Sequence, residues 1–212
     1  MNNSIQKLFD SILSGDAQLT KEMIREALNA NLNPAEILTT GMIAAMAEVG
    51  ERFVKGEYFI PEMLVAARAM QQGLSVLKPY LQQQDLVSEG KVVIGTIKGD
   101  LHDLGKNLVS MMLEGAGFEI VDLGTDVPLD KFLKAVQEND VVVLAMSALL
   151  TTTMSNMKTV INALQENGLR DKVKVIVGGA PVTESYALEI GADGYAPDAS
   201  RAVKLTKSLI HG

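Results

Sequence analysis

The stretch KVVIGTIKGDLHDLG, residues 91–105, is the most informative about the fold of the C-terminal part of the chain. It begins as an apolar run rich in Val and Ile and then turns abruptly to Gly, Asp and His. A short apolar run that is followed by turn residues and a helical pattern is typical of a strand buried on both faces of a parallel sheet. Because ligands of such sheets bind beyond the carboxyl ends of the strands, the polar end of this stretch marks a candidate site.

The same pattern recurs along the rest of the chain. Further apolar runs are FEIVDLG (118–124), DVVVLAMS (140–147), KVKVIVGG (172–179) and the weaker DGYA (193–196). Helical patterns follow the runs at residues 103–116, 129–138, 152–167, 182–190 and about 198–210. This alternation predicts an α/β domain over residues 91–212, with a flavodoxin-like, doubly wound, five-stranded parallel sheet.

The first 85 residues have a different period, with apolar residues at helical spacing. Asn33 followed by Pro34 and Glu36 is a strong helix start, which predicts a third helix from residue 34 to about residue 53. Pro61 opens a fourth helix that reaches about residue 82. We therefore expect a small, antiparallel, all-α four-helix bundle over residues 1–85. The polar stretch QQQDLVSEG (82–90) contains the predicted linker, residues 86–90.

Composition excludes several classes of function. The formal net charge of −7 argues against binding to nucleic acid. The absence of cysteine excludes disulfides, thiolate metal sites and cysteine nucleophiles. No apolar run has the length of a membrane span, and the N-terminus lacks the form of a signal peptide, so we expect a cytoplasmic protein.

His102 is one of two histidines in the chain and lies between two aspartates. As a metal ligand through one ring nitrogen, it would donate its other N–H to Asp100. One imidazole binds no free ion well, but it can hold the axial position of a metal caged in a macrocycle. The alternative is a loop histidine that caps the next helix or bonds the main chain. No GxGxxG or GxxxxGK[ST] motif is present, so neither a dinucleotide nor a P-loop site is expected.

Three motifs in order resemble the cobalamin-binding signature of corrinoid proteins and of cobalamin-dependent methionine synthase. They are D-x-H-x-x-G (Asp100, His102, Gly105), S-x-L (Ser147, Leu149) and G-G (Gly178, Gly179). The stretch VGERFVKGEYFIPEMLVAARAM (49–70) is similar to the helical cap that precedes this domain in methyl carriers. The likeness covers nearly the whole chain and is greatest to the small corrinoid proteins of methylamine, betaine, methanol and methoxyarene methyltransferase systems.

The resemblance implies roles for individual residues. His102 becomes the lower axial ligand of cobalt, with Asp100 bonded to it and Thr153 bonded to Asp100, and these three form the catalytic group. Phe53 and Ile60 match apolar residues that cover the upper face of the corrin. The full set of implied cofactor-binding residues is Phe53, Ile60, Gly99, Asp100, Leu101, His102, Asp103, Gly105, Ser147, Leu149, Thr151, Thr153, Gly178, Gly179, Ala180, Tyr195, Asp198 and Ala199.

From the residues alone, other interpretations stay open. Ser147 can be a hydroxyl at a strand end that bonds the main chain, and Thr153 can cap the following helix. Phe53 and Ile60 can belong to the core of the bundle. The paired glycines 178 and 179 can form a plain turn. Asp103 and Lys106 are interpreted as cap and surface residues rather than catalytic ones, and Asp122 and Asp126 as turn residues.

The resemblance implies a methyl carrier that is not catalytic alone. Its cofactor is cobalamin, as methylcobalamin or a related corrinoid. Its partners are a substrate-specific methyltransferase, a second methyltransferase directed to a thiol or tetrahydrofolate, and a reductive activator; neither nucleic acid nor a membrane is expected. Three alternatives remain: the cobalamin-binding subunit of a mutase, a cobalamin-dependent sensor or regulator, and a flavodoxin-like interaction module that binds no corrinoid.

Overall fold

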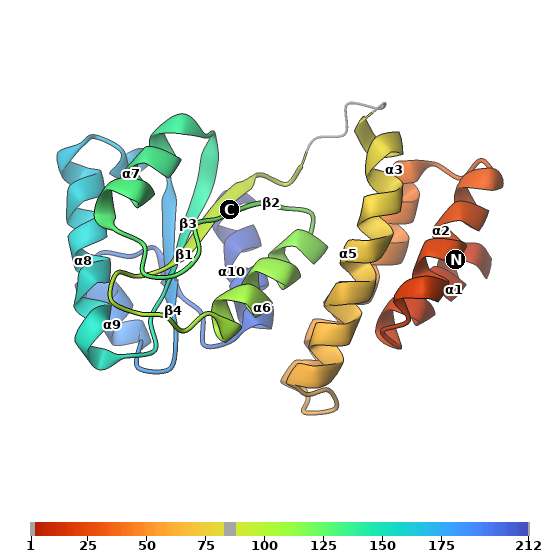
Figure 1. Cartoon of the computed structure of the whole chain (residues 1–212), viewed down its shortest axis with the longest axis horizontal. Helices are drawn as coiled ribbons and strands as arrows, with labels where there is room; N and C mark the ends of the chain where they lie inside the picture. The colour runs from red at the N-terminus through yellow and green to blue at the C-terminus, as the bar shows by residue number, and fades with distance from the viewer. Residues whose placement is uncertain (1–2, 83–87, 212) are drawn as a thin grey trace. The chain divides into compact units, whose positions relative to one another are not determined.

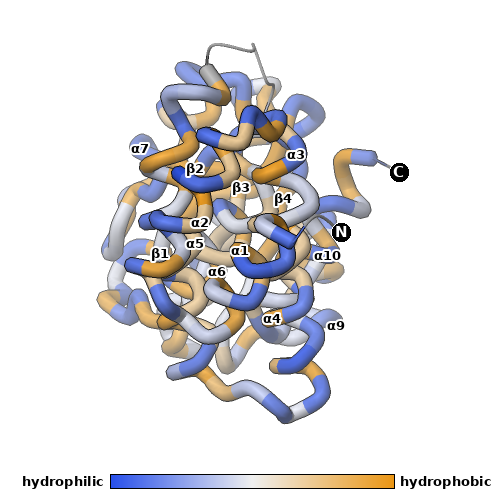
Figure 2. The backbone as a smooth tube through the Cα atoms, turned by 90° about the vertical axis from the view of Figure 1, so that its right-hand side faces the viewer, coloured by the Kyte–Doolittle hydropathy of each residue, from blue (hydrophilic) through white to orange (hydrophobic). Residues whose placement is uncertain are grey.

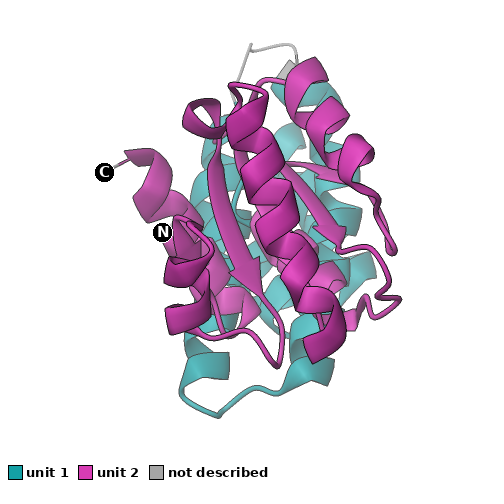
Figure 3. Ribbon diagram, turned by 90° about the vertical axis from the view of Figure 1, so that its left-hand side faces the viewer, with its two compact units in different colours: residues 1–88, 114–117 teal, residues 89–113, 118–212 magenta. Residues whose placement is uncertain are grey.

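The computed structural model describes residues 3–82 and 88–211. The chain divides into two compact units (Figure 3). Unit 1 comprises Met1–Ser88 with Glu114–Gly117, and unit 2 comprises Glu89–Leu113 with Phe118–Gly212. Of the predicted linker, residues 86–87 lie outside the described residues.

Unit 1 is helical, as the sequence predicted. Its elements are α1 (Asn3–Leu13), α2 (Ala17–Asn29), α3 (Pro34–Glu36), the π-helix η1 (Ile37–Ile43), α4 (Ala44–Val54) and α5 (Ile60–Gln82). The third helix starts at its predicted signal, and α2 has a cap that was not predicted. The Asp16 carboxylate caps α2, and the Asn33 side chain caps α3 by accepting from the Ala35 N–H at 2.9 Å. Apolar and polar segments follow one another along these helices in Figure 2, as expected for amphipathic helices that bury one face.

The third helix differs from its prediction. It runs without a break from Pro34 to Val54, but seven residues in its middle form a π-helix. This segment, ILTTGMI, contains two threonines and a glycine, which are weak α-helix formers. Gly41 is buried in it, and a Cβ there would lie 2.9 Å from Leu8 Cδ2. The wider turn therefore coincides with a close approach of the backbone to α1.

Unit 2 contains the predicted parallel sheet. Its strands are β1 (Lys91–Thr96), β2 (Glu119–Asp122), β3 (Val141–Ser147), β4 (Lys174–Gly178) and β5 (Gly194–Tyr195). Its helical elements are α6 (Leu104–Gly115), α7 (Leu129–Glu138), α8 (Thr151–Glu166), the 3₁₀ turn η2 (Arg170–Lys172), α9 (Glu184–Glu189) and α10 (Ala199–His211). The described strands are all parallel in the order β2-β1-β3-β4-β5, which confirms the flavodoxin-like doubly wound fold.

Helices cover both faces of the sheet, as Figure 1 shows: α7, α8 and α9 on one side, α6 and α10 on the other. Alternate residues of each strand supply the two cores. Val93, Leu144 and Val175 belong to the buried cluster with Phe132 of α7 and Leu164 of α8. Because both faces are covered, the strands are almost continuously apolar.

The carboxyl ends of three strands meet in one row. Thr96 of β1 pairs with Ser147 of β3, and Ser147 pairs with Gly178 of β4. The loops that leave this row carry the motifs of the sequence analysis. The sheet thus brings segments that are far apart in the chain together at the carboxyl ends of its strands.

We predict that Gly95→Ala lowers the free energy of unfolding by about 1–3 kcal/mol, because a Cβ there overpacks a filled core. That Cβ would lie 2.9 Å from Cε1 of the Phe132 ring. Urea denaturation of the purified protein measures the cost. In a Phe132→Leu background the same substitution is expected to cost about 1 kcal/mol less, because the two sites are in contact. Equal costs in both backgrounds would contradict this packing.

Candidate functional site

The site is built around the carboxylate of Asp100, whose side chain is fully buried. Its Oδ1 atom accepts from the backbone N–H of His102 at 3.0 Å and lies 2.7 Å from His102 Nδ1. Its Oδ2 atom accepts from the N–H groups of Leu149 at 2.7 Å and Leu150 at 3.1 Å, and from Thr153 Oγ1 at 3.0 Å. One carboxylate therefore joins the loop after β1 to the start of α8.

These donors keep Asp100 ionised although it is buried. Burial by itself raises the pKa of a carboxyl group. The N–H donors of His102, Leu149 and Leu150 outweigh that effect and hold the pKa of Asp100 well below its usual range. The donors at Leu149 and Leu150 also lie at the N-terminus of the 16-residue helix α8, where the helix dipole favours a negative charge.

One ring nitrogen of His102, Nδ1, is hydrogen-bonded to Asp100, and the orientation of the ring leaves Nε2 accessible to a ligand. Nδ1 donates to Asp100, because an ionised carboxylate can only accept. The side chain is 51% exposed, so Nε2 is the nitrogen that can reach a ligand. Within residues 3–82 and 88–211, no group of three or more acidic or histidine side chains is arranged to hold a metal ion. The geometry suits a metal that brings its own equatorial ligands.

Thr96 is a further member of the site that the sequence analysis missed. It is fully buried, and its hydroxyl donates to the carbonyl of His102 at 3.0 Å. The hydroxyls of Thr96 and Ser147 lie 2.9 Å apart, so Ser147 donates to Thr96. In the sequence Thr96 is a β-branched residue within a strand, and no local signal separates it from the other strand residues.

The glycine pair after β4 lies where a side chain has no room. Gly179 has a φ of +123°, and a Cβ there would overlap the carbonyl oxygen of Ala148. A Cβ at Gly178 would lie 2.9 Å from the Ala196 carbonyl oxygen. The paired glycines therefore let the loops after β3, β4 and β5 approach one another closely.

The other predicted cofactor residues lie in unit 2 at the same edge or in unit 1. Exposed residues follow the ends of β1, β3 and β4, whereas Tyr195 and Ala199 are partly or fully buried near the end of β5. Asp198 accepts from the Arg201 N–H at 2.8 Å at the start of α10. Phe53 is half-buried and Ile60 is 43% exposed, and both belong to unit 1. The exposed residues are Gly99, Leu101, Asp103, Gly105, Leu149, Thr151, Gly179 and Ala180.

One interpretation from the sequence was wrong. Lys106 is not a surface residue: its side chain is buried and pairs with Asp122 at 2.5 Å. The alternative in which Thr153 caps α8 is excluded, because the N-cap position is Leu150 and the Thr153 hydroxyl donates to Asp100. The roles of the predicted residues toward a cofactor stay predictions.

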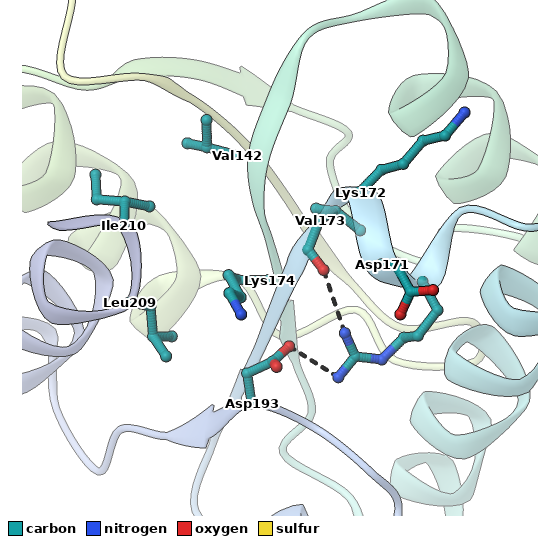
Figure 4. A pocket seen from close by; sticks show the side chains of 9 residues that line it. Val142, Asp171, Lys172, Val173, Lys174, Asp193, Leu209 and Ile210 are labelled. Atoms are coloured by element: carbon teal, nitrogen blue, oxygen red, sulfur yellow. Dashed lines mark hydrogen bonds and ion pairs between the residues drawn. The ribbon is translucent and has the colours of Figure 1, made fainter. Parts of the chain in front are cut away.

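A hollow of about 580 Å³ lies away from this site (Figure 4). Lys174, at the amino end of β4, lines it together with residues of η2 and α10. Arg170 pairs there with Asp193 at 2.8 Å and donates to the Val173 carbonyl at 3.2 Å. Asp100 and His102 follow the carboxyl end of β1, whereas this hollow lies at the amino ends of the strands.

Comparison with known proteins agrees with the fold and the site. Residues 90–204 match a sequence profile described as the B12 binding domain, and residues 4–78 match a second profile of the same description. The fold and the site thus define a cobalamin-binding protein.

Individual relatives show to which family of cobalamin-binding proteins the chain belongs. The chain is 45% identical over 209 residues to the trimethylamine corrinoid protein of Methanosarcina barkeri, an alignment that covers 98% of this chain and 96% of that relative. It is 44% identical to the dimethylamine corrinoid protein of the same organism, with 97% of each covered. A solved structure of the methanol:cobalamin methyltransferase complex of Methanosarcina barkeri matches with a TM-score of 0.88 at 30% identity, over 100% of this chain and 81% of that one. The chain belongs to the corrinoid protein family.

The residues at the edge of the sheet fit a corrinoid. His102 offers one free imidazole nitrogen for an axial position. His102 lies in the loop between β1 and α6, residues 97–103, which we call the histidine loop. A Cβ at Gly105 would meet no atom within 4 Å, so the space beside this loop is open. Leu101, which precedes His102 in the chain, and Leu149, whose N–H binds Asp100, are exposed and supply apolar surface at the site.

We predict that Asp100→Asn destabilises the corrinoid-free protein by about 3 kcal/mol at pH 7, because an amide presents N–H groups to buried donors. Urea denaturation measures the effect. Asp171→Asn is the matched control, since Asp171 is exposed. A cost no larger than that of the control would contradict the central place of Asp100.

The same pair of proteins tests the charge of Asp100. Because the pKa of Asp100 is lowered on folding, its contribution is fully present above the pKa of an unfolded aspartate, about 3.9, and is lost as the pH falls below that value. The stability difference between wild type and Asp100→Asn should therefore shrink as the pH falls from 5 toward 2. A difference that stays constant over this range would show that the charge contributes nothing.

We predict that Thr153→Val costs about 1–2 kcal/mol, because it removes one buried donor to the carboxylate while keeping the shape of the side chain. Thr153→Ser keeps the hydroxyl and is expected to retain most of the stability. Thermal unfolding of the three proteins gives the comparison. Equal losses for Val and Ser would indicate packing rather than hydrogen bonding.

Proposed function

We propose that this chain is a methyl carrier that holds a corrinoid with His102 as the lower axial ligand of cobalt. The observation that carries the proposal is the bond between His102 Nδ1 and Asp100, which leaves an exposed Nε2. A bound corrinoid supplies a cobalt centre that accepts and releases a methyl group. The side chains of this protein bind, orient and tune that centre.

Asp100 and Thr153 set the orientation and the basicity of the ligand. A histidine that donates to a carboxylate keeps one tautomer and becomes a stronger metal ligand. The Thr153 hydroxyl and the N–H groups of Leu149 and Leu150 hold that carboxylate in place. The network therefore fixes which ring nitrogen of His102 is available to a ligand.

The remaining predicted residues are proposed to receive the rest of the cofactor. Gly178, Gly179 and Ala180, with Tyr195, Asp198 and Ala199, would lie along the nucleotide tail. Ser147, Leu149 and Thr151 would lie beside the tail near β3. In unit 1, Phe53 and Ile60 would contact the upper face of the corrin.

The proposed partners follow from the relatives. The names of two relatives specify trimethylamine and dimethylamine, and a structural neighbour is a complex with a methyltransferase activity. We propose that a substrate-specific methyltransferase loads the carrier, with a methylamine as the first methyl donor to test. A second methyltransferase, directed to a thiol or tetrahydrofolate, unloads it, and a reductive activator restores it. This exchange is proposed to occur in the cytoplasm.

The axial ligand can be identified with ¹⁵N-histidine-labelled protein loaded with unlabelled cobalamin and reduced by one electron. We expect the nitrogen splitting in the electron paramagnetic resonance spectrum to be a doublet, because ¹⁵N-imidazole replaces the base of the cofactor. His102→Ala should give either the triplet of the cofactor's own base or no nitrogen splitting. A wild-type spectrum that is unchanged by labelling would refute ligation by His102.

Methyl transfer tests the carrier function itself. Reduced, cobalamin-loaded protein is mixed with candidate partner methyltransferases and with methylamines, betaine, methanol or aryl methyl ethers. We expect the visible spectrum to change with one class of donor and partner. Binding of cobalamin without transfer from any donor would instead favour a mutase subunit or a sensor.

A further inference from the structure

Asp126 binds the histidine loop from a segment that follows β2, whereas α8 follows β3, the strand on the other side of β1. It lies in the loop that joins β2 to α7, residues 123–128. Its Oδ1 atom accepts from the Gly99 N–H at 2.7 Å, and its own N–H donates to the Asp100 carbonyl at 2.9 Å. The side chain and the main chain of one residue therefore bind the main chain of two successive residues, Gly99 and Asp100.

Asp126 makes this contact in an uncommon backbone conformation. Its φ is +50°, in the left-handed region that few residues other than glycine adopt. Asp and Asn tolerate this region better than other side chains do. Asp126 is exposed, so burial in a core does not force the conformation. An outlier of this kind persists where surrounding contacts fix it, and such residues cluster at functional sites.

The loop that carries Asp126 is itself held at several points. The Asp122 carboxylate accepts from the Gly124 N–H at 2.8 Å and pairs with the buried ammonium of Lys106. Thr96 donates its N–H to the Gly124 carbonyl at 2.9 Å, and the Val127 N–H donates to the Thr96 carbonyl at 3.0 Å. The loop thus runs beside the histidine loop as a fixed support.

We propose that Asp126 is a positioning residue for His102. Thr153 and the start of α8 fix the carboxylate of Asp100, whereas Asp126 fixes the main chain from which that carboxylate projects. Both constraints are needed to orient the imidazole of His102, because a carboxylate that projects from a mobile backbone does not hold its hydrogen-bond partner in one orientation. The inference rests on the proposed role of His102 as the axial ligand.

Three substitutions separate the contributions of Asp126. Asp126→Asn keeps an acceptor oxygen and the tolerance for a left-handed backbone. Asp126→Gly keeps the backbone conformation but removes the acceptor. Asp126→Ser shortens the side chain so that its oxygen falls short of the Gly99 N–H. Circular dichroism and urea denaturation of the corrinoid-free proteins establish that each variant folds.

The first readout needs no corrinoid. In the wild type and in Asp126→Asn, the Gly99 amide should exchange slowly with solvent deuterium. In Asp126→Gly and Asp126→Ser it should exchange about five-fold faster or more, as the loss of one net hydrogen bond implies. Unchanged exchange at Gly99 in both variants would overturn the proposal.

The second readout is the fraction of cobalamin ligated by ¹⁵N-labelled His102, taken from the nitrogen splitting. We expect the ratio of ligated to unligated cobalamin to fall about five-fold in Asp126→Gly and to be restored in Asp126→Asn. An Asp126→Gly protein with the wild-type ratio would overturn the proposal. Failure of both Gly and Ser variants to fold would also overturn it, since Asp126 would then be needed for folding. Absence of histidine splitting in the wild type would instead refute the proposed function.

Discussion

The buried carboxylate of Asp100 is the constraint on which the site depends. A buried carboxylate is tolerated only with partners, and here His102, Leu149, Leu150 and Thr153 supply them. Those donors come from two loops that are some fifty residues apart in the chain, and they meet because β1 and β3 are neighbours in the sheet. The strand order is therefore what makes an ionised Asp100 possible.

The histidine loop is held from two directions. On one side the start of α8 binds the carboxylate, and on the other Asp126 binds the main chain of Gly99 and Asp100. Thr96, between them, binds the carbonyl of His102. An imidazole fixed in this way needs little reorganisation to bind a metal, which is the condition for a well-defined axial ligand. The pairing of the strands therefore also fixes the geometry of the site.

The sequence predicts the parts of this arrangement that have a local signature. Val- and Ile-rich runs give the strands, and the motif around His102 places the site at the end of β1. Contacts that depend on which strands are neighbours leave no such signature: Thr96 resembles any strand residue, and Asp126 resembles any turn residue. Lys106 was misjudged because a charged side chain is buried only when a partner, here Asp122, is near. The π-helix within residues 34–54 was not predicted. A π-helix has about one residue more per turn than an α-helix, and over seven residues this hardly changes the spacing of the apolar residues in the sequence.

The tautomer of the His102 imidazole is the decisive quantity to measure, because every proposed role of this residue depends on its bond to Asp100. Long-range ¹H–¹⁵N correlation spectra of the corrinoid-free protein distinguish a protonated from an unprotonated ring nitrogen, and the other histidine, His211, can be assigned by substitution. We expect the neutral imidazole of His102 to carry its proton on Nδ1, so that Nε2 is unprotonated. A neutral imidazole protonated on Nε2, or an unchanged spectrum in Asp100→Asn, would contradict this expectation.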